Sequence, residues 1–244
     1  MTQDEIEEIA FKWTGKRPVR NVDAETFIRA CGNGDIDFVR AALEHDKSLA
    51  NARGEIGITP LMMTATQGHK DIAKLLVENG ADIDAVSEGD ITALMAAVRG
   101  DHIEIVKLLI ENKANLETKN GDYKTALAMA VTEEHYEVAK LLAESGADVN
   151  TNVEEFSLLM LACAKGWGNS AELLIKNGAD VNRSDISGRT ALMFVCLTGN
   201  FEIVKLLVEN GANIGRRSIY GETAIAIAVG KGFSEIARFL QSRA

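Results

Sequence analysis

The stretch Thr59-Pro60-Leu61-Met62 has counterparts at a nearly fixed spacing along the chain. In each counterpart a hydroxyl residue precedes a small or apolar residue, and successive hydroxyl residues lie 33, 33, 32, 33 and 33 positions apart. A period of this length predicts a solenoid, in which each unit buries its apolar face only against its neighbours. The counterparts are Thr92-Ala93-Leu94-Met95, Thr125-Ala126-Leu127-Ala128, Ser157-Leu158-Leu159-Met160, Thr190-Ala191-Leu192-Met193 and Thr223-Ala224-Ile225-Ala226.

Each unit predicts two helices and a turn. The hydroxyl oxygen can accept a hydrogen bond from an amide of the first helical turn, and Pro60 stands where no amide is needed. A second, amphipathic helix follows, with Ile72, Leu75 and Leu76 at helical spacing before Gly80. The first helix is short, because a glycine suited to the left-handed conformation follows its start within the unit. These glycines are Gly68, Gly166, Gly199 and Gly232.

Several positions in the unit match those of a known family. Gly68-His69 lies downstream of the Thr59 stretch, and residues 178–182 read Gly-Ala-Asp-Val-Asn. In these residues the unit resembles the ankyrin repeat, which carries Thr-Pro-Leu-His, a downstream Gly-His and a closing Gly-Ala-Asp-Val-Asn. Six units match clearly, and a weaker one precedes them, with Glu25 placed 34 residues before Thr59. The resemblance implies an all-α fold, an α-solenoid of stacked ankyrin-type helix-turn-helix repeats joined by short β-hairpin turns.

The period also predicts how the chain is divided. We expect residues 1–21 to form an N-terminal capping helix and linker, because Thr2 and Glu5 make a capping-box pattern ahead of an apolar face that includes Ile6 and Trp13. Residues 22–244 then form the repeat array. Its expected units are 22–53, 54–86, 87–119, 120–151, 152–184, 185–217 and 218–244.

Composition and charge restrict the class of partner. The 244 residues are 46% hydrophobic and 25% charged, which excludes a predominantly disordered chain. No apolar run approaches the roughly 18 residues needed to cross a bilayer, and the acidic first residues carry no secretory signal. The net charge of −10 argues against nucleic acid and anionic lipid, although residues 183–244 carry 8 basic and 5 acidic side chains. We therefore expect a protein partner, no nucleic acid, no membrane and a chain that is monomeric by itself.

The residues that commonly carry chemistry do not form a catalytic pattern. His69, His102 and His135 recur at the repeat spacing, but stacked helices lie about 8 to 10 Å apart, whereas each zinc ligand must approach its ion to about 2 Å. We interpret these histidines as turn residues. The sequence also lacks a Gly-rich phosphate loop, a nucleophile elbow and a His-Glu-x-x-His motif. We expect no enzyme, no catalytic residue, no metal and no cofactor, and interpret the acidic run near Glu133 as a solvated face or, alternatively, a contact patch.

The cysteines and methionines fit a structural role. Cys31, Cys163 and Cys196 occupy a slot that other units fill with a small residue such as Ala65. We expect buried, reduced thiols, which suggest a reducing, cytoplasmic compartment. Methionine replaces the family's histidine in the repeated stretch, and we interpret these side chains as a core stripe. They are Met62, Met95, Met160 and Met193.

The resemblance implies a binding surface. In the family, the turns before the first helices form hairpin fingers, and the fingers and the exposed face of those helices make a concave groove that binds other proteins. Many of these fingers carry an apolar or aromatic side chain where a solvated turn would be polar, and aromatic residues with Arg are typical binding anchors. The alternative is that a finger's apolar side chain packs on the next finger. The predicted partner-binding residues are Ile56, Ile58, Glu88, Ile91, Arg99, Asp122, Tyr123, Lys124, Glu133, Val153, Phe156, Lys165, Trp167, Ile186, Arg189, Ile219 and Tyr220.

Two hypotheses for the function follow. The first is a non-catalytic protein-protein interaction module that binds its partner through the groove and the fingers. The alternative is a stoichiometric inhibitor or immunity-type protein that occludes an enzyme. Within the surface, Trp167 has two interpretations, because it either fills the space left by the small Ser170 or is an exposed contact.

Overall fold

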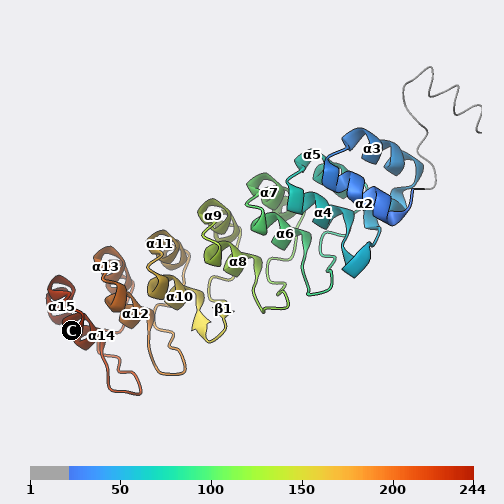
Figure 1. Cartoon of the computed structure of the whole chain (residues 1–244). Helices are drawn as coiled ribbons and strands as arrows, with labels where there is room; N and C mark the ends of the chain where they lie inside the picture. The colour runs from blue at the N-terminus through green and yellow to red at the C-terminus, as the bar shows by residue number, and fades with distance from the viewer. Residues whose placement is uncertain (1–21) are drawn as a thin grey trace, which may run out of the picture. The chain divides into compact units, whose positions relative to one another are not determined.

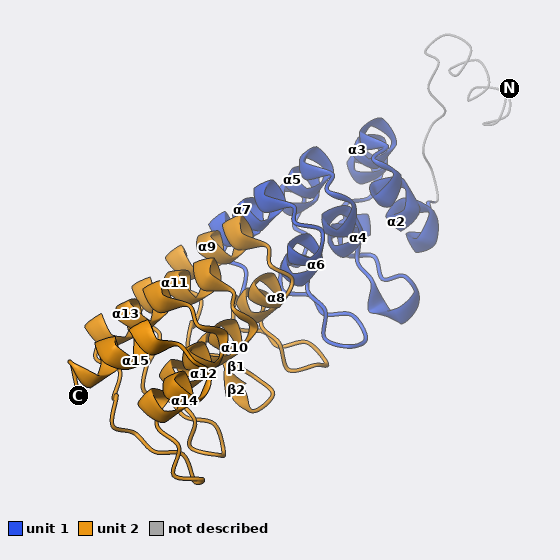
Figure 2. Ribbon diagram, turned by 60° about the vertical axis from the view of Figure 1, so that its left-hand side comes forward, with its two compact units in different colours: residues 1–115 blue, residues 116–244 orange. Residues whose placement is uncertain are grey.

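The computed structural model describes residues 22–244. The capping helix predicted over residues 1–21 lies outside the described residues. The chain divides into two compact units, residues 1–115 and 116–244, which Figure 2 colours separately.

The described part of unit 1, residues 22–115, contains three consecutive pairs of helices. The first pair is α2 (Ala24–Asn33) and α3 (Ile36–His45), and two short 3-10 turns follow it, Lys47–Asn51 and Glu55–Gly57. The remaining pairs are α4 (Pro60–Gln67) with α5 (Lys70–Glu78) and α6 (Ala93–Arg99) with α7 (Ile103–Glu111). The first helices α2, α4 and α6 pack side by side, as do the second helices α3, α5 and α7 (Figure 1).

Unit 2 repeats this arrangement with four pairs of helices. They are α8 (Ala126–Thr132) with α9 (Tyr136–Glu144), α10 (Leu158–Lys165) with α11 (Gly168–Lys176), α12 (Ala191–Thr198) with α13 (Phe201–Glu209), and α14 (Ala224–Gly230) with α15 (Ser234–Gln241). The strands β1 (Asn152–Val153) and β2 (Phe156–Ser157) form one antiparallel hairpin ahead of α10, in which Val153 pairs with Phe156. The all-α solenoid fold is confirmed. Among the described loops only this one is a two-stranded ladder; a single bridge, Ser184 to Thr190, marks another.

The hydroxyl residues of the repeated stretch begin the first helices as predicted. The Thr59 hydroxyl oxygen accepts a hydrogen bond from the Met62 amide at 3.2 Å, and the Thr125 hydroxyl accepts one from the Ala128 amide at 3.3 Å. Thr190 is the exception, because its buried hydroxyl makes no capping bond and has no partner among the described residues. The same cap bond forms at Thr92, Ser157 and Thr223.

The first helices end in the left-handed conformation. Gly68 and Gly199 have φ angles of 81° and 80°, and the corresponding positions of two other repeats hold Asp101 and Glu134 at 53° and 60°. Glycine is therefore favoured but not required at this stop. At Gly68 a Cβ atom would also lie 2.6 Å from the ring of His102, so the close approach of the next repeat adds a second reason for glycine.

The predicted turn histidines join successive repeats. In unit 1 the His69 Nε2 atom lies 3.0 Å from the Gly32 carbonyl oxygen, and the His102 Nε2 atom lies 3.1 Å from the Thr66 carbonyl oxygen. These carbonyls belong to the last turn of the preceding first helix, where intrahelical donors are lacking. Each histidine therefore caps the helix of the repeat before its own.

The core of each unit is a thin layer of aliphatic side chains between the two rows of helices. Leu61 and Leu94 are almost wholly buried in unit 1, as are Leu127 and Leu158 in unit 2. None of the helices between residues 22 and 244 has the length and hydropathy to cross a bilayer. The methionines of the repeated stretch are confirmed as core residues, and at most 3% of their surface is exposed. They are Met62, Met95, Met160 and Met193.

We predict that Thr125→Val and Thr190→Val have different effects on stability. Both remove a buried hydroxyl and keep the side-chain shape. Thr125→Val breaks a cap and should lower the free energy of unfolding by about 1 kcal/mol. Thr190→Val removes an unpartnered hydroxyl and should be neutral or stabilising. Urea unfolding followed by circular dichroism measures both, and equal losses would contradict the assignment of the cap.

Candidate functional site

The loops ahead of the first helices project from the helical layers (Figure 1). We call the eight residues before each cap hydroxyl a finger. A polar residue near the middle of the finger organises its turn: in finger 5, for example, the Asp185 carboxylate accepts hydrogen bonds from the Ser187 and Arg189 amides at 2.9 and 2.8 Å. Fingers 1 and 2 are residues 51–58 and 84–91 of unit 1, and fingers 3 to 6 are residues 117–124, 149–156, 182–189 and 215–222 of unit 2.

Most fingers close through the same backbone bond. An amide donates to the carbonyl oxygen four residues later, at 2.9 to 3.0 Å, and finger 4 closes instead through the β1–β2 hairpin. A shared closure means that the fingers have similar shapes and differ mainly in their side chains. The bonds run from Gly54 to Ile58, Ser87 to Ile91, Asn120 to Lys124, Asp185 to Arg189 and Ser218 to Glu222.

Neighbouring fingers are also bonded to one another. In unit 1 the Glu88 amide donates to the Ile56 carbonyl oxygen at 2.8 Å, and the Arg53 guanidinium donates to the Val86 carbonyl oxygen at 2.7 Å. In unit 2 the Ile219 amide donates to the Ser187 carbonyl oxygen at 2.9 Å. These bonds link finger 1 to finger 2 and finger 5 to finger 6, so each pair presents a single, pre-organised surface.

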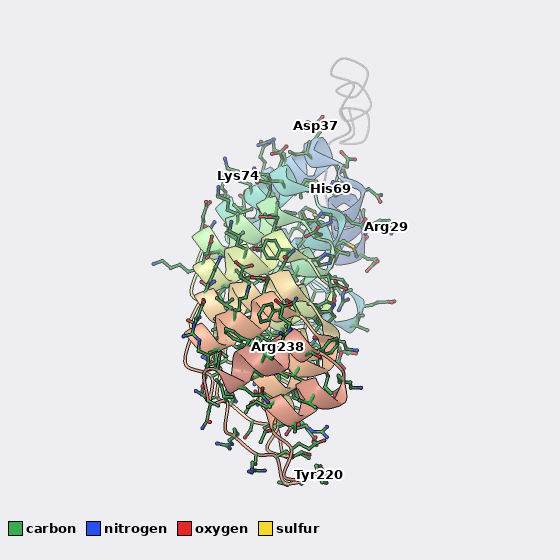
Figure 3. All side chains as sticks on the ribbon, turned by 90° about the vertical axis from the view of Figure 1, so that its left-hand side faces the viewer. Arg29, Asp37, His69, Lys74, Tyr220 and Arg238 are labelled. Atoms are coloured by element: carbon green, nitrogen blue, oxygen red, sulfur yellow. The ribbon has the colours of Figure 1, made fainter. Side chains whose placement is uncertain are left out.

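Exposed apolar side chains are concentrated on the fingers. Six of the ten large hydrophobic residues that are exposed in the described chain lie there. Tyr123 and Ile186 are 77% and 76% exposed, and Tyr220, labelled at the tip of its loop in Figure 3, is 69% exposed. Such exposure is the feature expected of binding anchors. The other three are Ile56, Val86 and Ile219.

Some finger tips are also held in an unfavourable backbone conformation. Ile56 and Tyr123 have φ angles of 51° and 60°, and Glu154 has 55°. A β-branched or bulky residue at positive φ is rare, and this strain costs of order 1 kcal/mol or more. The conformation turns large side chains to solvent at positions where glycine would be more stable.

The residues predicted to bind a partner differ in exposure. Of these, Arg189 is partly exposed and pairs with Glu222 at 2.9 Å, and the Glu133 carboxylate lies 3.4 Å from the His135 ring. The exposed group is Ile56, Glu88, Arg99, Asp122, Tyr123, Glu133, Lys165, Ile186, Ile219 and Tyr220. The half-buried group is Ile58, Ile91, Lys124, Phe156, Trp167 and Arg189.

Two of the predicted residues instead support finger 4. Val153 is only 8% exposed. The Phe156 ring packs edge-on against the ring of Phe194 in α12, with centroids 5.6 Å apart. Phe156 thus packs within the array, although on a helix and not on the next finger. We leave both residues out of the proposed contact surface.

Trp167 lies at the start of α11 and is half-buried. Together with Ser170, Tyr136 and Glu134 it lines a shallow hollow of about 280 Å³. The indole therefore does not fill all of the space beside Ser170, and part of its surface stays accessible.

Four large apolar residues on the helices, Ile103, Tyr136, Leu197 and Val229, are exposed although the sequence did not predict them as contacts. Leu197, near the end of α12, is 39% exposed. It stands seven residues after Thr190, as Arg99 stands seven residues after Thr92. The repeat register alone could have identified it.

The comparison with protein-family models identifies the family of the repeat array. The model described as ankyrin repeats matches the chain in three copies, over residues 13–87, 85–153 and 155–244. The chain belongs to the ankyrin repeat family. The ankyrin repeat is a protein-interaction fold and is generally non-catalytic.

Two curated relatives match parts of this ankyrin array at 35% identity. One is the acyl-CoA-binding domain-containing protein 6 homolog of Dictyostelium discoideum, matched over 94 residues, or 32% of each chain. The other is the human NAD-capped RNA hydrolase NUDT12, matched over 73 residues, or 30% of this chain and 16% of that protein. The match therefore spans about a third of the first relative and a sixth of the second.

Two solved structures resemble the ankyrin array over most of its length. One is a chain of the complex between the Bd0816 predatory endopeptidase of Bdellovibrio bacteriovorus and the immunity protein Bd3460. It is 32% identical, with a TM-score of 0.63, over 79% of this chain and 100% of that chain. The other is the human ASB11 ankyrin repeat domain, with a TM-score of 0.69 and 24% identity over 89% and 97% of the two chains. The second likeness shows the shared fold.

The cysteines of the ankyrin array are free and buried. Burial raises the pKa of each thiol, of Cys31, Cys163 and Cys196, from 9.0 to about 12. Among residues 22–244, no three His, Cys, Asp or Glu side chains gather closely enough to hold a metal ion.

We predict that the three thiols resist modification in the folded protein. A pKa near 12 in place of 9.0 lowers the thiolate fraction at pH 8 by roughly 1,000-fold. A disulfide reagent such as dithionitrobenzoate should label none of them in buffer and all three in guanidinium. The thiols of the unfolded chain lose their protons near pH 9, whereas those of the folded chain keep them to about pH 12. The free energy of unfolding should therefore also fall as the pH rises above 9. Rapid labelling of the native chain would contradict the buried assignment.

We predict that Tyr123→Gly stabilises the array. Relief of the left-handed strain is worth about 1 to 2 kcal/mol, and the greater entropy of unfolded glycine offsets about 0.5 to 1 kcal/mol. The matched control, Asp122→Gly, lies beside it at a position without positive φ and should destabilise. Urea unfolding of the two variants compares them, and a loss of equal size in both would refute the strain at Tyr123.

Proposed function

We propose that this ankyrin protein is a non-catalytic interaction module that binds a partner protein through its fingers. The observation that carries the proposal is the row of exposed apolar tips, above all Tyr123, Ile186 and Tyr220. Contact between apolar side chains and water is unfavourable, and covering such a surface with a partner lowers the free energy.

The linked fingers support the same proposal. A surface whose loops are already bonded together loses little conformational entropy on binding. The strained tips add to this support, because Tyr123 is kept in a conformation that stability alone does not favour. Within unit 2, Glu133 and Lys165 are exposed at the ends of α8 and α10, and the proposed contact includes them as polar groups.

The non-catalytic assignment is part of the proposal. It rests on the ankyrin repeat fold, which is generally non-catalytic, and on exposed tips such as Ile56, Ile186 and Ile219, which carry no titratable group. The buried, protonated thiols support a reducing compartment such as the cytoplasm.

The alternative function is a stoichiometric inhibitor of an enzyme. The observation that favours it is the 32% identity to a chain of the endopeptidase–immunity protein complex. The match covers 100% of that chain. Both functions use the finger surface and differ in what the partner does. Loss of the partner's enzymatic activity on titration with one equivalent of this protein would distinguish the inhibitor from a scaffold.

The binding function predicts that Tyr123→Ala, Ile186→Ala and Tyr220→Ala together abolish partner capture. Truncation of a buried aromatic anchor typically costs about 2 kcal/mol or more, so the triple variant should bind at least about 100-fold more weakly. The measurement is affinity capture followed by mass spectrometry and titration of the partner.

The matched control replaces exposed apolar residues outside the fingers, Ile103, Tyr136 and Val229, by alanine. It also removes exposed apolar side chains, which are 37% to 58% exposed, and should retain the partner. Equal capture by both triple variants, with helical circular dichroism unchanged, would refute a finger interface.

A further inference from the structure

Fingers 5 and 6 differ from the other fingers of unit 2 in charge. They contain four arginines, Arg183, Arg189, Arg216 and Arg217, and two carboxylates, Asp185 and Glu222. Fingers 3 and 4 contain two lysines and four carboxylates. The balance is thus +2 on the last pair and −2 on the pair before it, within a single unit.

The two carboxylates of this pair are already engaged. The Asp185 carboxylate accepts two amides of its own turn, and the Glu222 carboxylate pairs with the Arg189 guanidinium at 2.9 Å. Arg216 and Arg217 have no carboxylate partner among the described residues. They donate to neutral oxygens, the Ser184 hydroxyl at 3.3 Å and the Gly221 carbonyl at 3.0 Å. Each guanidinium has five N–H donors, so most remain available.

Apolar side chains stand beside these charges. Ile186, Ile219 and Tyr220 are each at least 69% exposed. The Arg189 guanidinium carbon lies 5.8 Å from the centre of the Tyr220 ring, within the range of a cation–π contact. Figure 3 shows Tyr220 at the outer end of its loop. The surface therefore combines uncompensated positive charge with aliphatic and aromatic area.

The two fingers form one rigid surface. The Ile219 amide bonds the Ser187 carbonyl, the Arg216 guanidinium reaches Ser184, and the Arg189–Glu222 pair crosses from finger 5 to finger 6. A Cβ atom on Gly188 would lie 3.4 Å from the Ser218 Cα atom, so the backbones are in close contact. Linked arginines keep their spacing, which favours recognition of carboxylates at matching positions.

We propose that fingers 5 and 6 bind an acidic segment of the partner protein, in which carboxylates alternate with apolar side chains. The proposal rests on the protein-binding function above and names the chemistry of the partner. Carboxylates would pair with Arg216 and Arg217, and apolar side chains would cover Ile186, Ile219 and Tyr220.

Two other occupants fit the surface less well. A nucleic acid backbone would use the arginines but not the aliphatic Ile186 and Ile219, and a chain of net charge −10 repels it. A second copy of this chain carries the same net charge and is repelled for the same reason. Both remain outcomes of the experiment.

The test is a selection of random 15-residue peptides displayed on phage against the immobilised full-length chain. Selected peptides should be rich in Asp and Glu interleaved with aromatic or aliphatic residues. The strongest peptide, labelled with fluorescein, is then titrated by fluorescence anisotropy. Arg216→Glu and Arg217→Glu should each weaken its binding by about tenfold or more. Raising the salt from 50 to 500 mM should also weaken it by about tenfold.

Lys231→Glu is the matched control, because it changes the net charge equally at an exposed residue at the end of α14. It should alter affinity by less than about twofold, because Lys231 stands at the opposite end of α14 from finger 6 and salt screens its exposed charge. Arg217→Lys keeps the charge but not the planar guanidinium. Its affinity for the peptide should lie between that of the native chain and that of Arg217→Glu.

Several results would overturn the proposal. These are enrichment of neutral or basic peptides, equal effects of Arg217→Glu and Lys231→Glu, and tighter binding of a single-stranded oligonucleotide than of the peptide. Self-association of the native chain that Arg217→Glu abolishes, measured by light scattering, would identify a second copy as the occupant instead.

The failure of this inference can be separated from the failure of the proposed function. If the triple-alanine variant loses peptide binding while Arg216→Glu and Arg217→Glu leave the affinity unchanged, that result supports the interaction module and refutes the acidic partner segment. If the native chain enriches no peptide more than the triple-alanine variant does, both the finger interface and the acidic partner segment are refuted.

Discussion

Each repeat of this chain can bury its apolar face only against the repeats beside it, and the remaining structure depends on that constraint. A pair of helices of seven to ten residues is too short to be stable alone in water. Leu61 and Leu94 illustrate the solution, because they are almost wholly buried between successive helices of unit 1. Once the first helices pack side by side, the loops that precede them must leave the helical layers along the same edge.

The fingers are a consequence of this stacking, and their side chains are free to carry function. The backbone bond that closes a finger is the same in fingers 1, 2, 3, 5 and 6. Exposed tips such as Tyr123 and Tyr220 contribute little to the core, so the fold does not dictate them. Fingers 3 and 4 differ in charge from fingers 5 and 6 on nearly the same framework. On the proposed function, selectivity would reside in the tips and in the charges near them.

Much of the fold could be predicted from local sequence. Thr59 and Thr125 begin helices, and Gly68 and Gly199 end them, because a cap bond or a positive φ depends on a few adjacent residues. The histidine at position 102 was placed in the turn correctly, but its bond to the Thr66 carbonyl crosses between repeats and has no local pattern. Thr190 begins the same Thr-Ala-Leu-Met stretch as Thr92, which makes the cap bond, yet Thr190 makes none, and its local sequence does not reveal this.

The sequence by itself determined the repeat period, the helix limits, the buried stripe of methionines and the positions of the fingers. These follow from spacing and from the conformational preferences of single residues. Only the tertiary structure decided which finger residues are exposed. Tyr123 and Phe156 are both aromatic finger residues, but the first is 77% exposed and the second packs on Phe194, 38 residues further along the chain. The physical reason is that exposure depends on what a neighbouring repeat brings into contact, and a sequence pattern records spacing along the chain, not contact across it.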